Sequence, residues 1–100
     1  MRETDYLCWL ESQPLKAKSI STLLSDARRV EREHGVDFDD EFVRDRLKSV
    51  RERLAYTADD ERQNRGNNSG LSIPRGNLRR TLSPYKSAVA RYAAFRDAGG

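Results

Sequence analysis

Apolar residues recur at steps of three and four along most of this chain, and this spacing constrains its fold more than any other feature. The clearest stretch covers residues 17–34, where Ile20, Leu24 and Val30 fall on one side of an α-helix. Gly35 follows at the position where a left-handed C-cap commonly ends a helix. The pattern therefore predicts a helix over residues 17–34 that ends at Gly35.

The same periodicity predicts helices on both sides of this one. A short N-terminal helix is expected to begin after an N-cap at Thr4 and to end before Pro14. A third helix is expected to end near Leu54, after a turn in which Phe38 points inward. Its apolar stripe consists of Phe42, Val43, Leu47, Val50 and Leu54.

The final quarter of the chain predicts two more helical segments. Leu78 and Leu82 share one stripe, and Ser83-Pro84 then has the form of an N-cap followed by proline at the first helical position. We therefore expect a boundary between two helices at Ser83. The buried face of the last helix is expected to consist of Tyr85, Val89, Tyr92 and Phe95.

Residues 57–73 interrupt this helical pattern. They contain several Gly and Asn residues and few apolar ones, so we expect a flexible loop there. The chain has 100 residues, which is enough for one hydrophobic core and too few for a second. The sequence thus predicts one all-α domain over residues 1–100, a small bundle of four to five helices.

The apolar runs are only a few residues long, far below the length that a membrane crossing requires. The charged start of the chain is not followed by the apolar segment of a secretory signal. We therefore expect no membrane association and a cytoplasmic location.

The potentially reactive side chains do not form a recognisable catalytic or metal-binding motif. The chain has one cysteine, Cys8, and one histidine, His34. We therefore expect no cofactor, no metal and no enzymatic activity. Cys8 is expected to be a packed thiol, and His34 to lie at the end of a helix. The carboxylates at 37–41 are expected to line a helix start, or alternatively to dock a basic partner.

Charge is distributed unevenly along the chain. Residues 62–100 contain eight basic side chains and one acidic one, whereas residues 35–61 contain five basic and nine acidic ones. Clustered arginines suit forked contacts with phosphate, although an exposed helix face is also often basic. The candidate nucleic-acid contacts are Arg62, Arg65, Arg75, Arg79, Arg80, Lys86 and Arg91, with Arg28 and Arg29 as a second row.

Five segments of the chain together are similar to a known helical domain. They are residues 6–10, 18–20 (Lys-Ser-Ile), 27–31 (Ala-Arg-Arg-Val-Glu), 35–38 (Gly-Val-Asp-Phe) and 85–95. Their order resembles the SAM-like core-binding domain that precedes the catalytic domain of tyrosine recombinases and phage integrases, and related domains at the front of some restriction-type proteins. The resemblance implies a bundle that clamps one side of duplex DNA, with cleavage chemistry in a separate domain.

Two functional hypotheses follow. The first is a non-catalytic module that binds duplex DNA through the phosphates, mainly with its basic last third. The second is a small free-standing phage or mobile-element protein that binds a host protein complex, for example as an inhibitor of CRISPR or restriction machinery. Apolar surface left over from so small a core also allows a homodimer.

Overall fold

The long helix α2 (Ala17–His34) is the base against which the rest of the chain packs. Its apolar stripe is buried at Ile20, Leu24, Ala27 and Val30, and Gly35 ends it in the left-handed conformation, with φ of 65°. The sequence therefore predicted both ends of this helix and its C-cap correctly. The physical reason is that periodicity and an αL glycine act locally, within the helix itself.

The computed structural model describes residues 1–63, 65–67, 69–71 and 78–99. These residues form α1 (Glu3–Glu11), α2, α3 (Phe38–Asp45), α4 (Lys48–Leu54), α5 (Ala58–Arg62) and α6 (Leu78–Asp97). The expected small all-α bundle is confirmed, and no strand occurs in these ranges. Within them, no helix has the length and apolar character needed to span a membrane.

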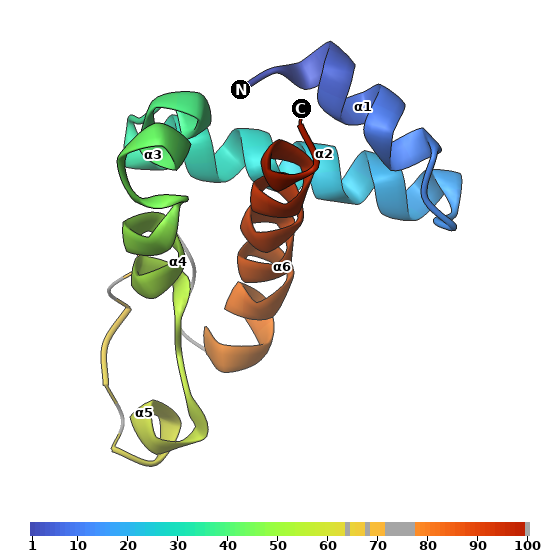
Figure 1. Ribbon diagram of the computed structural model, residues 1–100. Helices are drawn as coiled ribbons and strands as arrows, with labels where there is room; N and C mark the ends of the chain where they lie inside the picture. Colours follow the sequence, from blue (N-terminus) through green and yellow to red (C-terminus); the bar gives the residue numbers. More distant parts are fainter. Residues whose placement is uncertain (64, 68, 72–77, 100) are drawn as a thin grey trace.

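Figure 1 shows α6 crossing α2, with α1 on one side of the crossing and α3 and α4 on the other. The start of α1 and the end of α6 lie at one end of the molecule, and α5 lies at the other. The contact between α2 and α6 is the most extensive in the fold, followed by that between α4 and α6. The helix α6 therefore packs against different helices along its length, with α2 and α4 as its main neighbours.

An aromatic cluster fills the core where α1, α3 and α6 meet. The Tyr6 and Tyr92 rings meet edge to face, with centroids 4.9 Å apart, and Phe38 lies 5.5 Å from Tyr92. The Tyr92 hydroxyl donates to Asp39 Oδ1 at 2.6 Å and accepts from the backbone N–H of Arg2 at 2.9 Å. The hydrogen bond to Tyr92 fixes the backbone of Arg2, which is the N-cap of α1. The N-cap expected at Thr4 is therefore wrong, because Thr4 lies inside the helix.

The single helix expected through residues 42–54 is wrong, because a turn divides it into α3 and α4. Arg46 and Leu47 both adopt the left-handed conformation, with φ of 57° and 66°. Leu47 is fully buried, whereas Val43 is 80% exposed. An unbroken helix would place these two residues on one face, and the turn separates them. Tertiary packing of Leu47 thus overrides the local periodicity.

The boundary expected at Ser83-Pro84 is also wrong, since α6 runs through it from Leu78 to Asp97. Pro84 has no N–H, so the helix lacks one internal hydrogen bond there. Leu82 before the proline and Val89 after it are both buried, at 2% and 0% exposure. Because both sides are fixed by the same core, the helix continues across the proline.

A short helix that the sequence did not predict lies in the segment expected to be a loop. The Thr57 hydroxyl accepts from the N–H of Asp60 at 3.2 Å, and the Asp60 carboxylate accepts from the N–H of Thr57 at 2.9 Å. This reciprocal capping box begins α5. The spacing of Thr57 and Asp60 was the available signal, but the five residues of α5 contain no apolar periodicity.

Candidate nucleic-acid interface

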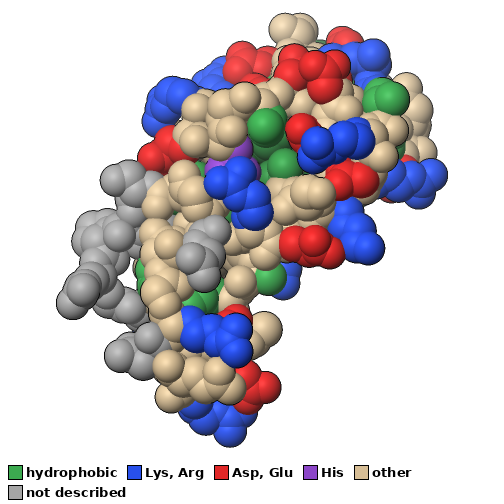
Figure 2. Space-filling model, turned by 90° about the vertical axis from the view of Figure 1, so that its left-hand side faces the viewer, with side chains coloured by type: hydrophobic (Ala, Val, Ile, Leu, Met, Phe, Trp, Pro, Cys, Tyr) green, Lys and Arg blue, Asp and Glu red, His purple; other side chains and the backbone are tan. Residues whose placement is uncertain are grey.

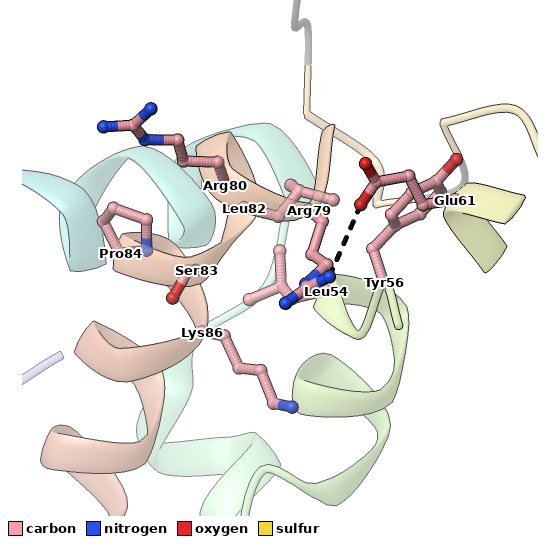
Figure 3. Close-up of a pocket in the computed structure, with 9 residues that line it drawn as sticks. All are labelled: Leu54, Tyr56, Glu61, Arg79, Arg80, Leu82, Ser83, Pro84 and Lys86. Carbon is pink, nitrogen blue, oxygen red and sulfur yellow. Dashed lines mark ion pairs between the residues drawn. The ribbon is translucent and has the colours of Figure 1, made fainter. Parts of the chain in front are cut away.

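An open hollow of about 740 Å³ lies where α4, α5 and the first half of α6 come together (Figure 3). The α6 residues Arg79, Ser83 and Lys86 are spaced i, i+4 and i+7, which places them on one face of the helix. The other lining residues are Leu54, Tyr56, Glu61, Arg80, Leu82 and Pro84. The lining therefore combines apolar side chains with the cationic side chains of Arg79, Arg80 and Lys86.

Lys86 connects this hollow to a second one of about 300 Å³ along α4. Lys48 and Arg51, one helical turn apart, line the second hollow with Glu52 and Ala55. We call the two hollows together the α4–α6 groove. Figure 3 shows Lys86 pointing from α6 toward α4, and Arg79 pointing toward Glu61, whereas Arg80 points away from Arg79.

The groove carries the net positive charge of the protein. Its lining includes five basic and two acidic side chains, a net charge of +3, which equals the net charge of the whole chain. Both acidic residues form long ion pairs: Glu61 lies 3.6 Å from Arg79, and Glu52 lies 4.0 Å from Lys48. Exposed pairs of this kind are weak, so a phosphate can replace the carboxylate at little cost.

The structure brings three of the sequence-predicted contacts together in the groove, namely Arg79, Arg80 and Lys86. Arg91 lies elsewhere on α6, in a hollow of about 410 Å³ that it shares with Lys18 of α2. Arg75 lies outside the described residues. The eight basic residues of the last third therefore do not all line one site.

Several of the remaining predicted contacts are held by carboxylates. Arg62 pairs with Asp59, and Arg65 lies 3.4 Å from Asp60. Arg96, a basic residue of the last third that was not among the predicted contacts, is only 11% exposed and lies 3.6 Å from Asp39. The Arg96–Asp39 pair connects segments that are far apart in the sequence, whereas Arg62 and Asp59 are only three residues apart on α5.

The second row of predicted contacts on α2 is likewise engaged within the protein. Arg28 binds both carboxylate oxygens of Glu3, at 2.8 and 3.2 Å. Arg29 binds Glu33 at 2.6 Å, donates to the Tyr85 hydroxyl and lies 5.1 Å from the centroid of that ring. Tyr85 is consequently half-buried at the edge of the core.

Sequence reasoning missed Lys48 and Arg51 as members of the site. Their three-residue spacing fits one face of a helix, but they lie in segment 35–61, whose net charge is negative. Figure 2 shows basic and acidic side chains interspersed over the face that it displays. Which cations share a groove depends on helix packing.

The two potentially reactive side chains, His34 and Cys8, lie outside the groove. His34 Nε2 lies 2.5 Å from the carbonyl oxygen of Ser69. Burial lowers the pKa of His34, and the positive charge of Arg53 adds to this effect. Cys8 is exposed, so the expected packed thiol is wrong: the buried side of α1 carries Tyr6 and Leu10 instead.

The acidic residues at the start of α3 serve the fold. The Asp37 carboxylate caps α3 by accepting from the N–H of Asp39 at 2.7 Å and of Asp40 at 3.4 Å. The amino group of Met1 lies 2.9 Å from Glu31 and 3.6 Å from both Asp37 and Asp39. In the described part of the chain, no three His, Cys, Asp or Glu side chains are grouped as metal ligands would be.

Comparisons of the chain with protein-family models, with curated proteins and with solved structures found no match. The resemblance to recombinase core-binding domains therefore stays a prediction, and the functional argument depends on the groove.

Proposed function

We propose that this protein is a non-catalytic DNA-binding module that holds the phosphates of duplex DNA in the α4–α6 groove. One observation carries the proposal: the lining of the groove has a net charge of +3, so the remainder of the chain is neutral overall. Clustered cations on one surface are the electrostatic feature by which proteins bind a nucleic-acid backbone. The resemblance to core-binding domains points to the same class of partner.

The contacts in this proposal differ in part from those that the sequence suggested. Lys48 and Arg51 of α4 act with Arg79 and Lys86 of α6, one pair on each side of the groove. Arg62 and Arg65 contribute to the field near α5, although each is paired with a carboxylate. Arg28 and Arg29 hold Glu3 and Glu33, so the proposal gives them no direct contact with DNA.

A salt titration of binding to a short duplex tests the proposal. Four phosphate contacts predict that the logarithm of the binding constant falls with the logarithm of salt concentration, with a slope of roughly −3 to −4. Lys86→Ala is expected to weaken binding and to reduce the magnitude of the slope by about one. Lys18→Ala is the matched control, because Lys18 is exposed on α2 in a different hollow.

Two outcomes would contradict this function. One is an absence of binding at low salt, and the other is an equal effect of the two lysine substitutions. The second would mean that only total charge matters and that the groove has no special part in binding.

A second candidate is the docking of a protein partner, which the exposed face of α3 favours. Val43 is 80% exposed there, and it is the one large apolar side chain of the described residues with such exposure. The partner would then be a host protein complex, as the mobile-element hypothesis states. A stoichiometric partner that survives nuclease treatment, and that Val43→Asp releases while Lys86→Ala does not, would favour this function over DNA binding.

A further inference from the structure

We infer that the α4–α6 groove receives an unpaired nucleotide of the bound DNA, with its base stacked on Tyr56 and its phosphates beside Arg79 and Lys86. This inference rests on the proposed function and goes beyond it, because phosphate binding alone requires no aromatic side chain in the groove. It names the form of DNA that the site should prefer.

Tyr56 has the position that such a contact requires. It lines the hollow of about 740 Å³ and also a neighbouring hollow of about 500 Å³. The side chain is half-buried, which leaves part of it accessible. A base entering from the α6 side would therefore meet the aromatic side chain of Tyr56.

The Tyr56 side chain is held in place from both ends. Its hydroxyl donates to the carbonyl oxygen of Arg65 at 2.6 Å, with a longer contact of 3.4 Å to that of Asp60. Its backbone follows the end of α4, where Leu54 is buried against the core. An aromatic ring fixed before binding loses little conformational freedom when a base stacks on it.

The charges around Tyr56 match a nucleotide. Arg79 and Lys86 line the same hollow from α6, and Glu61 also lines it, 3.6 Å from Arg79 in an exposed pair that a phosphate would displace. The volume of about 740 Å³ falls within the range of roughly 300–1,000 Å³ typical of small-molecule sites. Positively charged grooves with aromatic side chains on which bases stack are the usual means of binding unpaired nucleic acid. A fully paired duplex would offer phosphates to the cations but no base to the ring.

The test compares three DNA probes of equal length at one salt concentration: a paired duplex, the same duplex with a single-nucleotide 2-aminopurine bulge, and the single strand. We expect the bulged duplex to bind at least about tenfold more tightly than the paired one, since stacking on an aromatic side chain makes a contribution of this size. The 2-aminopurine fluorescence is expected to fall on binding, because the base stacks.

Two substitutions separate the ring from its hydroxyl. Tyr56→Leu removes the aromatic ring and is expected to abolish the preference for the bulge, while binding to the paired duplex remains. Tyr56→Phe keeps the ring and is expected to retain the preference. Thermal unfolding followed by circular dichroism checks that both variants are folded.

The outcomes distinguish this inference from the function on which it rests. If the paired and bulged duplexes bind equally, or if Tyr56→Leu keeps the preference, the stacking inference is wrong and phosphate binding stands. If none of the three probes binds at low salt, the proposed function is wrong, and the inference falls with it.

Discussion

The two halves of α6 form one continuous helix, yet they lie in different surroundings. In the first half, only Leu82 is buried. In the second half, five residues are buried against α1, α2 and α3, namely Ala88, Val89, Tyr92, Ala93 and Phe95. We call the surroundings of the second half the packed end, and those of the first half, with α4 and α5, the groove end. The difference indicates that one end stabilises the fold and leaves the other free to carry a binding surface.

Charge differs between the two ends as well. At the packed end, Arg96 lies 3.6 Å from Asp39 and the Met1 amino group lies 2.9 Å from Glu31, so cations face carboxylates at close range. At the groove end, Arg79 and Glu61 also lie 3.6 Å apart, but their side chains are 56% and 52% exposed, so water screens this pair. No pair joins Lys86 or Arg51 to a carboxylate of the described residues. Stability and binding should therefore respond to different substitutions, and four predictions test this separation.

The largest effect is expected at the packed end. Tyr92→Ala removes a fully buried ring and two hydrogen bonds, so it should lower the free energy of unfolding by about 3–5 kcal/mol. Urea denaturation measures the loss, and Tyr92→Phe, which removes only the hydroxyl, should cost about 1–2 kcal/mol. A loss below 1 kcal/mol for Tyr92→Ala would show that the packed end does not dominate stability.

The next effect has the opposite sign and lies at the groove end. Pro84 is exposed inside α6, where proline removes a helix hydrogen bond and is strongly unfavourable. Pro84→Ala should therefore raise the free energy of unfolding by about 2–3 kcal/mol, as measured by urea denaturation. An unchanged or lower stability would mean that the proline is accommodated without cost, and that the two ends do not differ in this respect.

A smaller loss is expected where the chain between α5 and α6 packs on the groove end. Gly70 has φ of 77°, and a Cβ there would collide with the guanidinium of Arg53 and lie 3.0 Å from His34 Cδ2. Gly70→Ala should lower the melting temperature, with a loss of about 1–2 kcal/mol. Gly66→Ala is the matched control, since a Cβ at Gly66 has no neighbour within 4 Å and should change stability little. Equal effects at the two glycines would mean that the left-handed backbone and the neighbours of Gly70 do not oppose a side chain there.

The smallest predicted effects concern pH, and two groups, the Met1 amino group and His34, should respond in opposite directions. Burial alone would lower the pKa of the Met1 amino group, but Glu31, Asp37 and Asp39 raise it above 8.0. Its contribution to stability is therefore complete below pH 8 and is lost as the pH rises through the folded-state pKa. Burial lowers the pKa of His34 below 6.5, so the unfolded state binds the proton more readily and stability falls as the pH drops below 6.5.

Thermal unfolding measured from pH 5 to pH 10 checks both directions. His34→Gln should remove the loss on the acid side and leave the alkaline one unchanged. A loss on the acid side that persists in this variant would assign it to groups other than His34 and remove the contrast between the two groups.

Local interactions explain which parts of the fold could be predicted. The bounds of α2, its Gly35 cap and the buried positions of Val89, Tyr92 and Phe95 follow from helical periodicity, which needs no knowledge of the partner surface. The division at Leu47 and the continuity through Pro84 required that knowledge. In both cases, burial of leucine side chains outweighs a local preference of the backbone.

The candidate site could be predicted only in part for a related reason. The sequence identified Arg79, Arg80 and Lys86 because they belong to the basic last third of the chain, and it missed Lys48 and Arg51 because they belong to the segment with a net negative charge. It also could not show that Arg96 faces Asp39, since these two residues are far apart in the sequence and meet only through helix packing. Tyr56 carried no sequence signal that set it apart from the other tyrosines.

The sequence by itself determined that this chain is helical and where α2 begins and ends. It also determined that the net positive charge lies in the arginine and lysine residues of the last third. The tertiary structure alone decided which of those cations stand beside one another and which face carboxylates. The physical reason is range: periodicity and capping act over one or two helical turns, whereas a groove and its electrostatic field arise from helices that are distant in sequence and meet only when the core forms.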